Sequence, residues 1–115
     1  YAAILGDKLK LSQKVLGHLM PFAMKGNYER YLADANLFME YLSIVVLGWL
    51  WLEMATDAKA TLSKSDKKYS EIFYESKIYT MKFYFKYEVP KTNSLAASLM
   101  SDEVLTIKNE KEYII

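Results

Sequence analysis

Apolar side chains recur at three- and four-residue steps through most of the chain, and no stretch alternates apolar and polar residues for long. This spacing is that of an α-helix, whereas a half-buried strand would alternate with a period of two. The pattern therefore predicts a single all-α domain, an up-down helical bundle of three long helices plus a short C-terminal helical tail. The expected helices cover residues 1–25, 28–62 and 67–88, and the tail covers 91–115.

Turn-forming residues predict where these helices begin and end. Gly26 suits the position just after a helix, and Asn27 suits the N-cap of the next one. Ser65 or Asp66 is expected to cap the third helix. Pro21 has no backbone N–H, so we expect it to bend the first helix or end it early.

The second helix carries apolar side chains on more than one face. One face follows helical steps: Leu32, Asn36, Met39, Ser43, Val46, Leu50 and Met54. Between Glu40 and Glu53, the twelve residues 41–52 are apolar all round the helix. A bilayer span needs about 20 residues, so we expect no membrane span. A helix that is apolar all round is normally buried on every side.

The third helix has two apolar stripes on opposite sides. The first contains Tyr69, Ile72, Phe73, Ser76, Thr80, Phe83 and Tyr87, and the second contains Tyr74, Ile78, Met81 and Phe85. One flank between them carries Glu71, Glu75, Lys82 and Lys86. An outer helix of a three-helix bundle has only one face to bury, so two stripes require a further partner. That partner is another chain or domain, or else residues 95–100 and 104–107 of the tail fold back.

Charge and residue type argue against several classes of function. The chain has 15 basic and 14 acidic residues and a formal net charge of +1, so no strongly basic surface favours nucleic acid. Lys77, Lys82 and Lys86 alternate with aromatic residues, but glutamates of the same helix argue against single-strand binding. Without cysteine there is no thiolate nucleophile or disulfide, and a cytoplasmic location is the default. The chain starts at Tyr1, and we interpret it as a fragment of a longer protein.

No residue pattern indicates catalysis or metal binding. His18 is the only histidine, and a lone histidine on an apolar helix is more often a half-buried polar tip than a catalyst. The four glycines are too dispersed for a phosphate-binding loop. Glu40 and Glu53 lie about 20 Å apart along a straight helix, too far to act on one bond. We therefore assign no catalytic, cofactor-binding or metal-ligating residue.

Several short motifs follow one another in a recognisable order. They are Gly48-Trp-Leu-Trp51, Phe73-Tyr74, Lys77, Phe83-Tyr84-Phe85, Glu88-Val89-Pro90 and Leu95-Ala-Ala-Ser-Leu-Met100. Over about residues 28–105, their order and spacing resemble the C-terminal extension of bacterial acyl-CoA dehydrogenases, the acetyl-CoA dehydrogenase-like C-terminal domain.

The resemblance implies a parent oxidoreductase of fatty acid metabolism, a flavoprotein that uses FAD to oxidise an acyl-CoA thioester between Cα and Cβ. In such enzymes the base and the main flavin contacts lie in other domains, so no catalytic residue is carried over. The domain is expected to be inert alone and to pack against the remainder of the dehydrogenase chain and its symmetry mate, fixing the oligomer. The candidates for contacts beyond its own core are Trp49, Trp51, Tyr74, Tyr84 and Phe85.

Two other interpretations remain open. The chain could be a stand-alone helical interaction module whose second stripe binds a partner helix. It could also be a small-ligand bundle that encloses an apolar pocket among its many Tyr and Met side chains.

Overall fold

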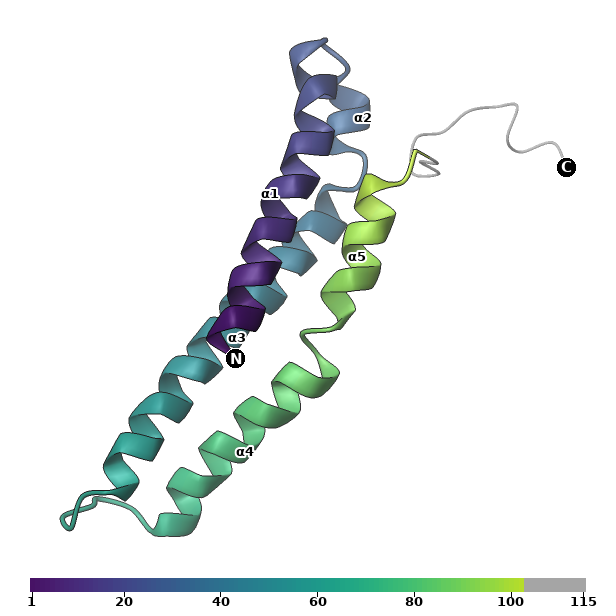
Figure 1. Cartoon of the computed structure of the whole chain (residues 1–115). Coiled ribbons are helices and arrows are strands. Elements are labelled where there is room, and N and C mark those ends of the chain that lie inside the picture. Colours follow the sequence, from purple (N-terminus) through teal and green to yellow (C-terminus); the bar gives the residue numbers. More distant parts are fainter. Residues whose placement is uncertain (103–115) are drawn as a thin grey trace, which may run out of the picture.

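The computed structural model describes residues 1–102, and these fold into helices joined by short turns (Figure 1). The helices are α1 (Ala2–Met24), α2 (Tyr28–Leu32), α3 (Ala35–Leu62), α4 (Glu71–Tyr87) and α5 (Lys91–Met100). No strand occurs within the described range. The predicted all-α class and helical bundle are confirmed.

The longest helix, α3, is the centre of an elongated arrangement. In Figure 1, α1 lies along one half of α3, α4 lies along the other half, and α5 continues from α4 back toward α1. The molecule measures 67 × 31 × 18 Å along its principal axes, and its radius of gyration is 19.5 Å. A compact domain of this length would have a radius of gyration of about 13 Å. The helices therefore overlap only in part, and much of α3 and α4 faces outward.

The core lies where α1, α4 and α5 meet α3. Its buried members come from all four helices and the turn before α5: Leu5, Val15, Leu19, Tyr41, Ile44, Val45, Ala55, Met81, Phe85, Val89, Ala96 and Leu99. At Gly48 the backbone of α3 approaches its neighbours so closely that a Cβ would lie 3.1 Å from Leu5 Cδ2. The same Cβ would lie 3.5 Å from a ring carbon of Tyr84, so a glycine here allows α1 and α4 to meet over α3.

Two tyrosine hydroxyls fix the neighbouring helices to α3. Tyr41 of α3 donates to the Lys8 carbonyl of α1 at 2.6 Å, and Tyr84 of α4 donates to the Ile44 carbonyl of α3 at 2.9 Å. Burial raises the pKa of both phenols above the usual value of 10.0, and the charge of Glu88 adds to the effect at Tyr84. Both hydroxyls therefore remain neutral donors at physiological pH.

The first predicted turn is confirmed, but the predicted helix 28–62 is divided into two helices. Gly26 has a φ of +80°, the left-handed conformation expected of a glycine after a helix. Asn27 caps α2, because its side chain accepts a hydrogen bond from the Arg30 N–H. The predicted helix 28–62 is interrupted after α2, and α3 begins again at Ala35 and continues without a break past Gly48.

Pro21, which we expected to bend the first helix or end it early, does not end it. It lies inside α1, which continues to Met24. The missing N–H removes one hydrogen bond close to the helix end, where few bonds remain to be lost. The last turn keeps the hydrogen bond from the Lys25 N–H to the Pro21 carbonyl at 3.1 Å. The Phe22 ring there meets His18 edge-on, and its centroid lies 4.7 Å from the Arg30 guanidinium carbon.

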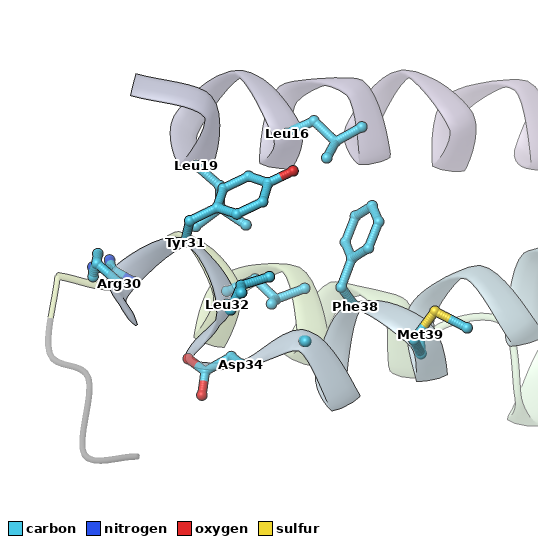
Figure 2. A pocket seen from close by; sticks show the side chains of 10 residues that line it. Leu16, Leu19, Arg30, Tyr31, Leu32, Asp34, Phe38 and Met39 are labelled. Carbon is cyan, nitrogen blue, oxygen red and sulfur yellow. The ribbon is translucent and has the colours of Figure 1, made fainter. Parts of the chain in front are cut away.

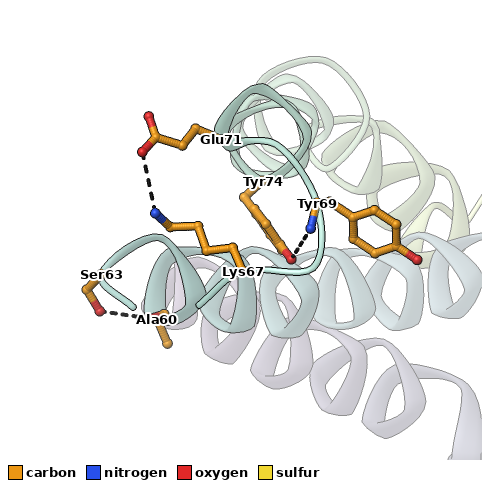
Figure 3. A network of polar contacts seen from close by, with 6 residues as sticks. All are labelled: Ala60, Ser63, Lys67, Tyr69, Glu71 and Tyr74. Carbon is orange, nitrogen blue, oxygen red and sulfur yellow. Dashed lines mark hydrogen bonds and ion pairs between the residues drawn. The ribbon is translucent and has the colours of Figure 1, made fainter. Parts of the chain in front are cut away.

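The predicted N-cap of the third helix is also wrong. The helix begins at Glu71, four residues later than expected, and Ser70 is the cap that accepts from the Phe73 N–H. Figure 3 shows the preceding loop, in which the Tyr69 N–H donates to the Tyr74 hydroxyl and Lys67 pairs with Glu71 at 3.4 Å. These contacts hold the loop in a non-helical conformation up to Ser70.

Candidate interaction surface

The face of α3 that the sequence singled out points away from the core. Its apolar members on α3 are exposed, namely Met39, Val46, Leu50 and Met54, and so is Leu32 of α2. Leu47 and Trp49 beside them are exposed too. The expectation that residues 41–52 are buried on every side is therefore wrong within the described chain. Contiguous apolar surface of this kind typically marks an interaction site.

The length and composition of α2 and α3 together also bear on membranes. The run Tyr28–Leu62 is long and apolar enough to cross a membrane, and only 22% of its most apolar window is buried in the chain. We expected no membrane span because residues 41–52 alone are too few to cross a bilayer. The full run Tyr28–Leu62 is longer than these twelve residues. The core helix of a soluble protein can be equally long and apolar, so length and composition alone do not assign a membrane span to this run.

The two stripes of α4 have different surroundings. The stripe of Tyr74, Ile78, Met81 and Phe85 faces α3. On the opposite side Ile72 is 77% exposed and Tyr79 is 72% exposed, with Phe83 and Tyr87 about half exposed. We call Ile72, Ser76, Tyr79, Phe83 and Tyr87 the outer stripe of α4. Its exposure agrees with the expectation that α4 has more apolar surface than this bundle buries.

The tail does not cover the outer stripe within the described residues. Residues 95–100 belong to α5, which packs against α1 and α3 through Thr92, Ala96 and Leu99. The other predicted covering segment, 104–107, lies outside the described residues. The alternative that the tail folds back onto α4 is thus wrong for the part of the tail that can be described.

The five predicted contact residues differ in exposure. Trp49 is 57% exposed on α3. Trp51 and Tyr84 are half-buried against the core, and Tyr74 is half-buried with its hydroxyl accepting from the Tyr69 N–H. Phe85 is only 5% exposed and its ring meets Tyr1 edge-on, so it contributes to this chain's own core and offers little surface to a partner.

One flank of α4, beside the outer stripe, divides into an acidic half and a basic half. Glu71 and Glu75 occupy the first half, and Lys82 and Lys86 occupy the second. All four residues are exposed. Within residues 1–102, neither Glu75 nor Lys82 has an oppositely charged side chain within 4.0 Å, so neither forms an ion pair. This flank is therefore available to an outside partner.

Groups that could perform chemistry are sparse. His18 is half-buried, and its Nε2 lies 4.0 Å from Asp102 Oδ1, beyond hydrogen-bond distance. Within residues 1–102 no three His, Asp or Glu side chains come together in a way that could hold a metal ion.

A small cavity lies between α1 and the start of α3. Its volume is about 140 Å³, and Figure 2 shows Tyr31 and Phe38 pointing into it toward α1, with Arg30 at one end. Ligand pockets generally measure about 300–1,000 Å³. A more open groove of about 430 Å³ lies between α3 and α4 next to Tyr1, with Lys59 and Lys82 among its lining residues. The cavity beside α1 is smaller than this range, whereas the groove between α3 and α4 lies within it.

Two residues were missed in the sequence analysis, one buried and one on the outer stripe. Arg30, the single arginine of the chain, is buried and donates to the Ser101 carbonyl at 2.7 Å. An isolated arginine among lysines is the signal that could have identified it, because arginine suits buried contacts better than lysine. Tyr79 was not assigned to the outer stripe, although its spacing from Ser76 and Phe83 is that of a heptad repeat.

Comparison of the sequence with known protein families gives a match. The acetyl-CoA dehydrogenase C-terminal-like family matches residues 1–108, so the match includes all the described helices and both exposed faces. No curated protein and no solved structure matches the chain. With nearly all of its length matched, the chain belongs to the acetyl-CoA dehydrogenase C-terminal-like family.

Proposed function

We propose that this chain is the C-terminal helical domain of an FAD-dependent acyl-CoA dehydrogenase, which oxidises an acyl-CoA thioester between Cα and Cβ. Membership of the acetyl-CoA dehydrogenase C-terminal-like family supports this proposal. In it the domain is non-catalytic, and its function is to pack against the rest of the enzyme and to help fix the oligomer. We place the enzyme in the cytoplasm.

FAD does not fit the described residues. The cavity of about 140 Å³ is far smaller than a dinucleotide requires, and the groove of about 430 Å³ beside Tyr1 is open to solvent. The glycines at 6, 17, 26 and 48 form no phosphate-binding loop. We therefore derive no catalytic step from this chain, and the proposal assigns flavin and acyl-CoA binding to the remainder of the enzyme.

The observation that carries the packing role is the outward face of α3. Met39, Val46, Leu50 and Met54 line up on one side of a helix whose other side is already buried against α1, α4 and α5. Leaving such a row in water is unfavourable by roughly 25 cal/mol per Å² of apolar surface. A domain that docks this row on the dehydrogenase core would remove the cost, which explains why the sequence keeps the face apolar.

The test uses the complete gene product that contains this chain. Its visible absorption spectrum is recorded before and after acyl-CoA thioesters of graded chain length are added without oxygen. We expect a flavin spectrum that bleaches with one of them, because reduction of the flavin removes its visible bands. A colourless protein that stays unchanged after FAD is supplied would contradict the dehydrogenase assignment. The stand-alone interaction module would then be the better description of the two exposed faces.

A further inference from the structure

The outer stripe of α4 has the spacing of a coiled-coil seam. Ile72, Ser76, Tyr79 and Phe83 follow one another at steps of four, three and four, which places them at alternating d and a positions of a heptad. Phe73 and Tyr87 lie beside the seam at e positions. Since α3 packs on the opposite side of α4, no described helix occupies this seam.

The exposed area of this seam is close to what a specific interface requires. A fully exposed aromatic side chain offers about 150–250 Å², so the exposed parts of the stripe and Phe73 amount to roughly 500 Å² per copy. Two copies that share the seam would bury about 1,000 Å², near the lower limit for specific association. Association through other parts of the protein would add to this area.

The charged flank specifies both the partner and its direction. Glu75 and Lys82 occupy successive g positions, and in an antiparallel pair of helices each g position faces a g position of the other helix. Two antiparallel copies of α4 would therefore place Glu75 of each copy beside Lys82 of the other. In a parallel pair, g faces e, so Glu75 would face Thr80 and Lys82 would face Tyr87. Only the antiparallel pair matches opposite charges.

We propose that α4 binds the α4 of a second copy of this chain, antiparallel, through the outer stripe, with Tyr79 close to the two-fold axis. The proposal rests on the packing role proposed above and assigns α4 to a second copy, while the α3 face remains for the rest of the protein. A membrane surface is the less favoured occupant, because helices that lie on anionic membranes are basic on their polar face. This flank balances two glutamates against two lysines.

A zero-length carbodiimide cross-link tests the contact directly. The complete gene product is prepared with mixed ¹⁴N and ¹⁵N copies, coupled, digested and analysed by mass spectrometry. Glu75 and Lys82 of one helix are about 10 Å apart along the axis, too far for direct coupling. We therefore expect an amide that joins Glu75 of a light copy to Lys82 of a heavy copy. Absence of this link in the wild-type protein would overturn the proposal.

Charge reversal gives a second, independent readout. Glu75→Lys and Lys82→Glu each place like charges at two symmetric positions, so each protein alone should associate through α4 about tenfold more weakly. Mixed with one another, the two variants regain opposite charges at both positions and should cross-link at residues 75 and 82 as wild type does. Glu53→Lys, the same charge change at an exposed site on α3, is the matched control and should have no effect.

Each remaining outcome decides the question. The reversal variants alone carry two lysines or two glutamates at these positions and cannot form this amide, so their self-association is measured by analytical ultracentrifugation. Self-association as tight as that of the wild-type protein would overturn the proposal. So would flotation with anionic vesicles that Lys82→Glu abolishes, because a membrane would then occupy the stripe. The flavin spectrum is read separately: a bleaching flavoprotein without the cross-link would refute only the α4 pairing, and a colourless protein with the cross-link would refute only the dehydrogenase assignment.

Discussion

Gly48 lies where three helices meet, so replacing it tests how closely they approach. A Cβ at this position would lie 3.1 Å from Leu5 Cδ2 and 3.6 Å from Val89 Cγ2. At Gly17, inside α1, a Cβ would meet nothing within 4 Å. The two residues are both helical glycines, and they form a matched pair that differs in its surroundings.

The expected magnitudes follow from these distances. Replacing glycine by alanine in a helix interior stabilises the folded state by about 1 kcal/mol, and we expect Gly17→Ala to show this gain. At Gly48 the Leu5 side chain must retreat, and with 6% of its surface exposed it has little room to do so. We expect Gly48→Ala to show no gain. Gly48→Val adds two methyl groups to the same contact and should cost about 2–3 kcal/mol.

Thermal unfolding followed by circular dichroism measures these differences. For a chain of this size, about 1 kcal/mol shifts the Tm by roughly 4 °C. Gly17→Ala should therefore raise the Tm by about 4 °C, and Gly48→Val should lower it by about 10 °C. A Gly48→Val protein as stable as wild type would refute the close approach of α1 and α4 over α3.

Two further predictions concern hydrogen bonds of the fold. Tyr41→Phe removes the bond to the Lys8 carbonyl and should cost about 1 kcal/mol at neutral pH. Because burial raises the pKa of the Tyr41 phenol above 10.0, its contribution is complete below pH 10 and is lost as the pH rises further. Urea unfolding across this range should show a smaller alkaline loss in the variant; equal losses would contradict the role of Tyr41. Ser70→Ala should cost about 1 kcal/mol by removing the α4 cap, whereas Ser65→Ala should be neutral, and the reverse order in Tm would restore the original cap assignment.

The local signals that predicted the fold correctly are those with a single interpretation. Glycine followed by asparagine predicts a helix end and a new cap, and Gly26 and Asn27 adopt these conformations. The loop before α4 offers several capping residues, and local spacing does not distinguish Ser65 from Ser70. The choice depends on the contact between the Tyr69 N–H and the Tyr74 hydroxyl, which sequence spacing does not reveal.

The sequence predicts that the bundle has exposed apolar surface, but it identifies only some of the residues that form this surface. The sequence revealed that α4 has two apolar stripes, but helical periodicity does not indicate which stripe faces α3. Phe85 was therefore chosen as a contact residue although it lies in the core, and Tyr79 was not. For α3, an apolar circumference suggested burial on all sides, whereas α1, α4 and α5 pack on one side of α3 and leave the other side exposed.

The central claim is that the outward face of α3 is covered in the complete protein. Methionines report on this directly, because Met39 and Met54 lie on the face, Met24 lies at the end of α1, and Met81 is buried. Within this chain Met39 is 61% exposed and Met24 is 82% exposed, so both should oxidise readily if nothing covers them.

Hydroxyl-radical footprinting of the complete gene product is the most direct measurement. We expect Met39 and Met54 to be protected to nearly the same degree as Met81, while Met24 is oxidised rapidly. The surface around Met24 thus serves as the internal control for accessibility. Oxidation of Met39 and Met54 at a rate close to that of Met24 would contradict the claim, because the α3 face would then be in contact with water.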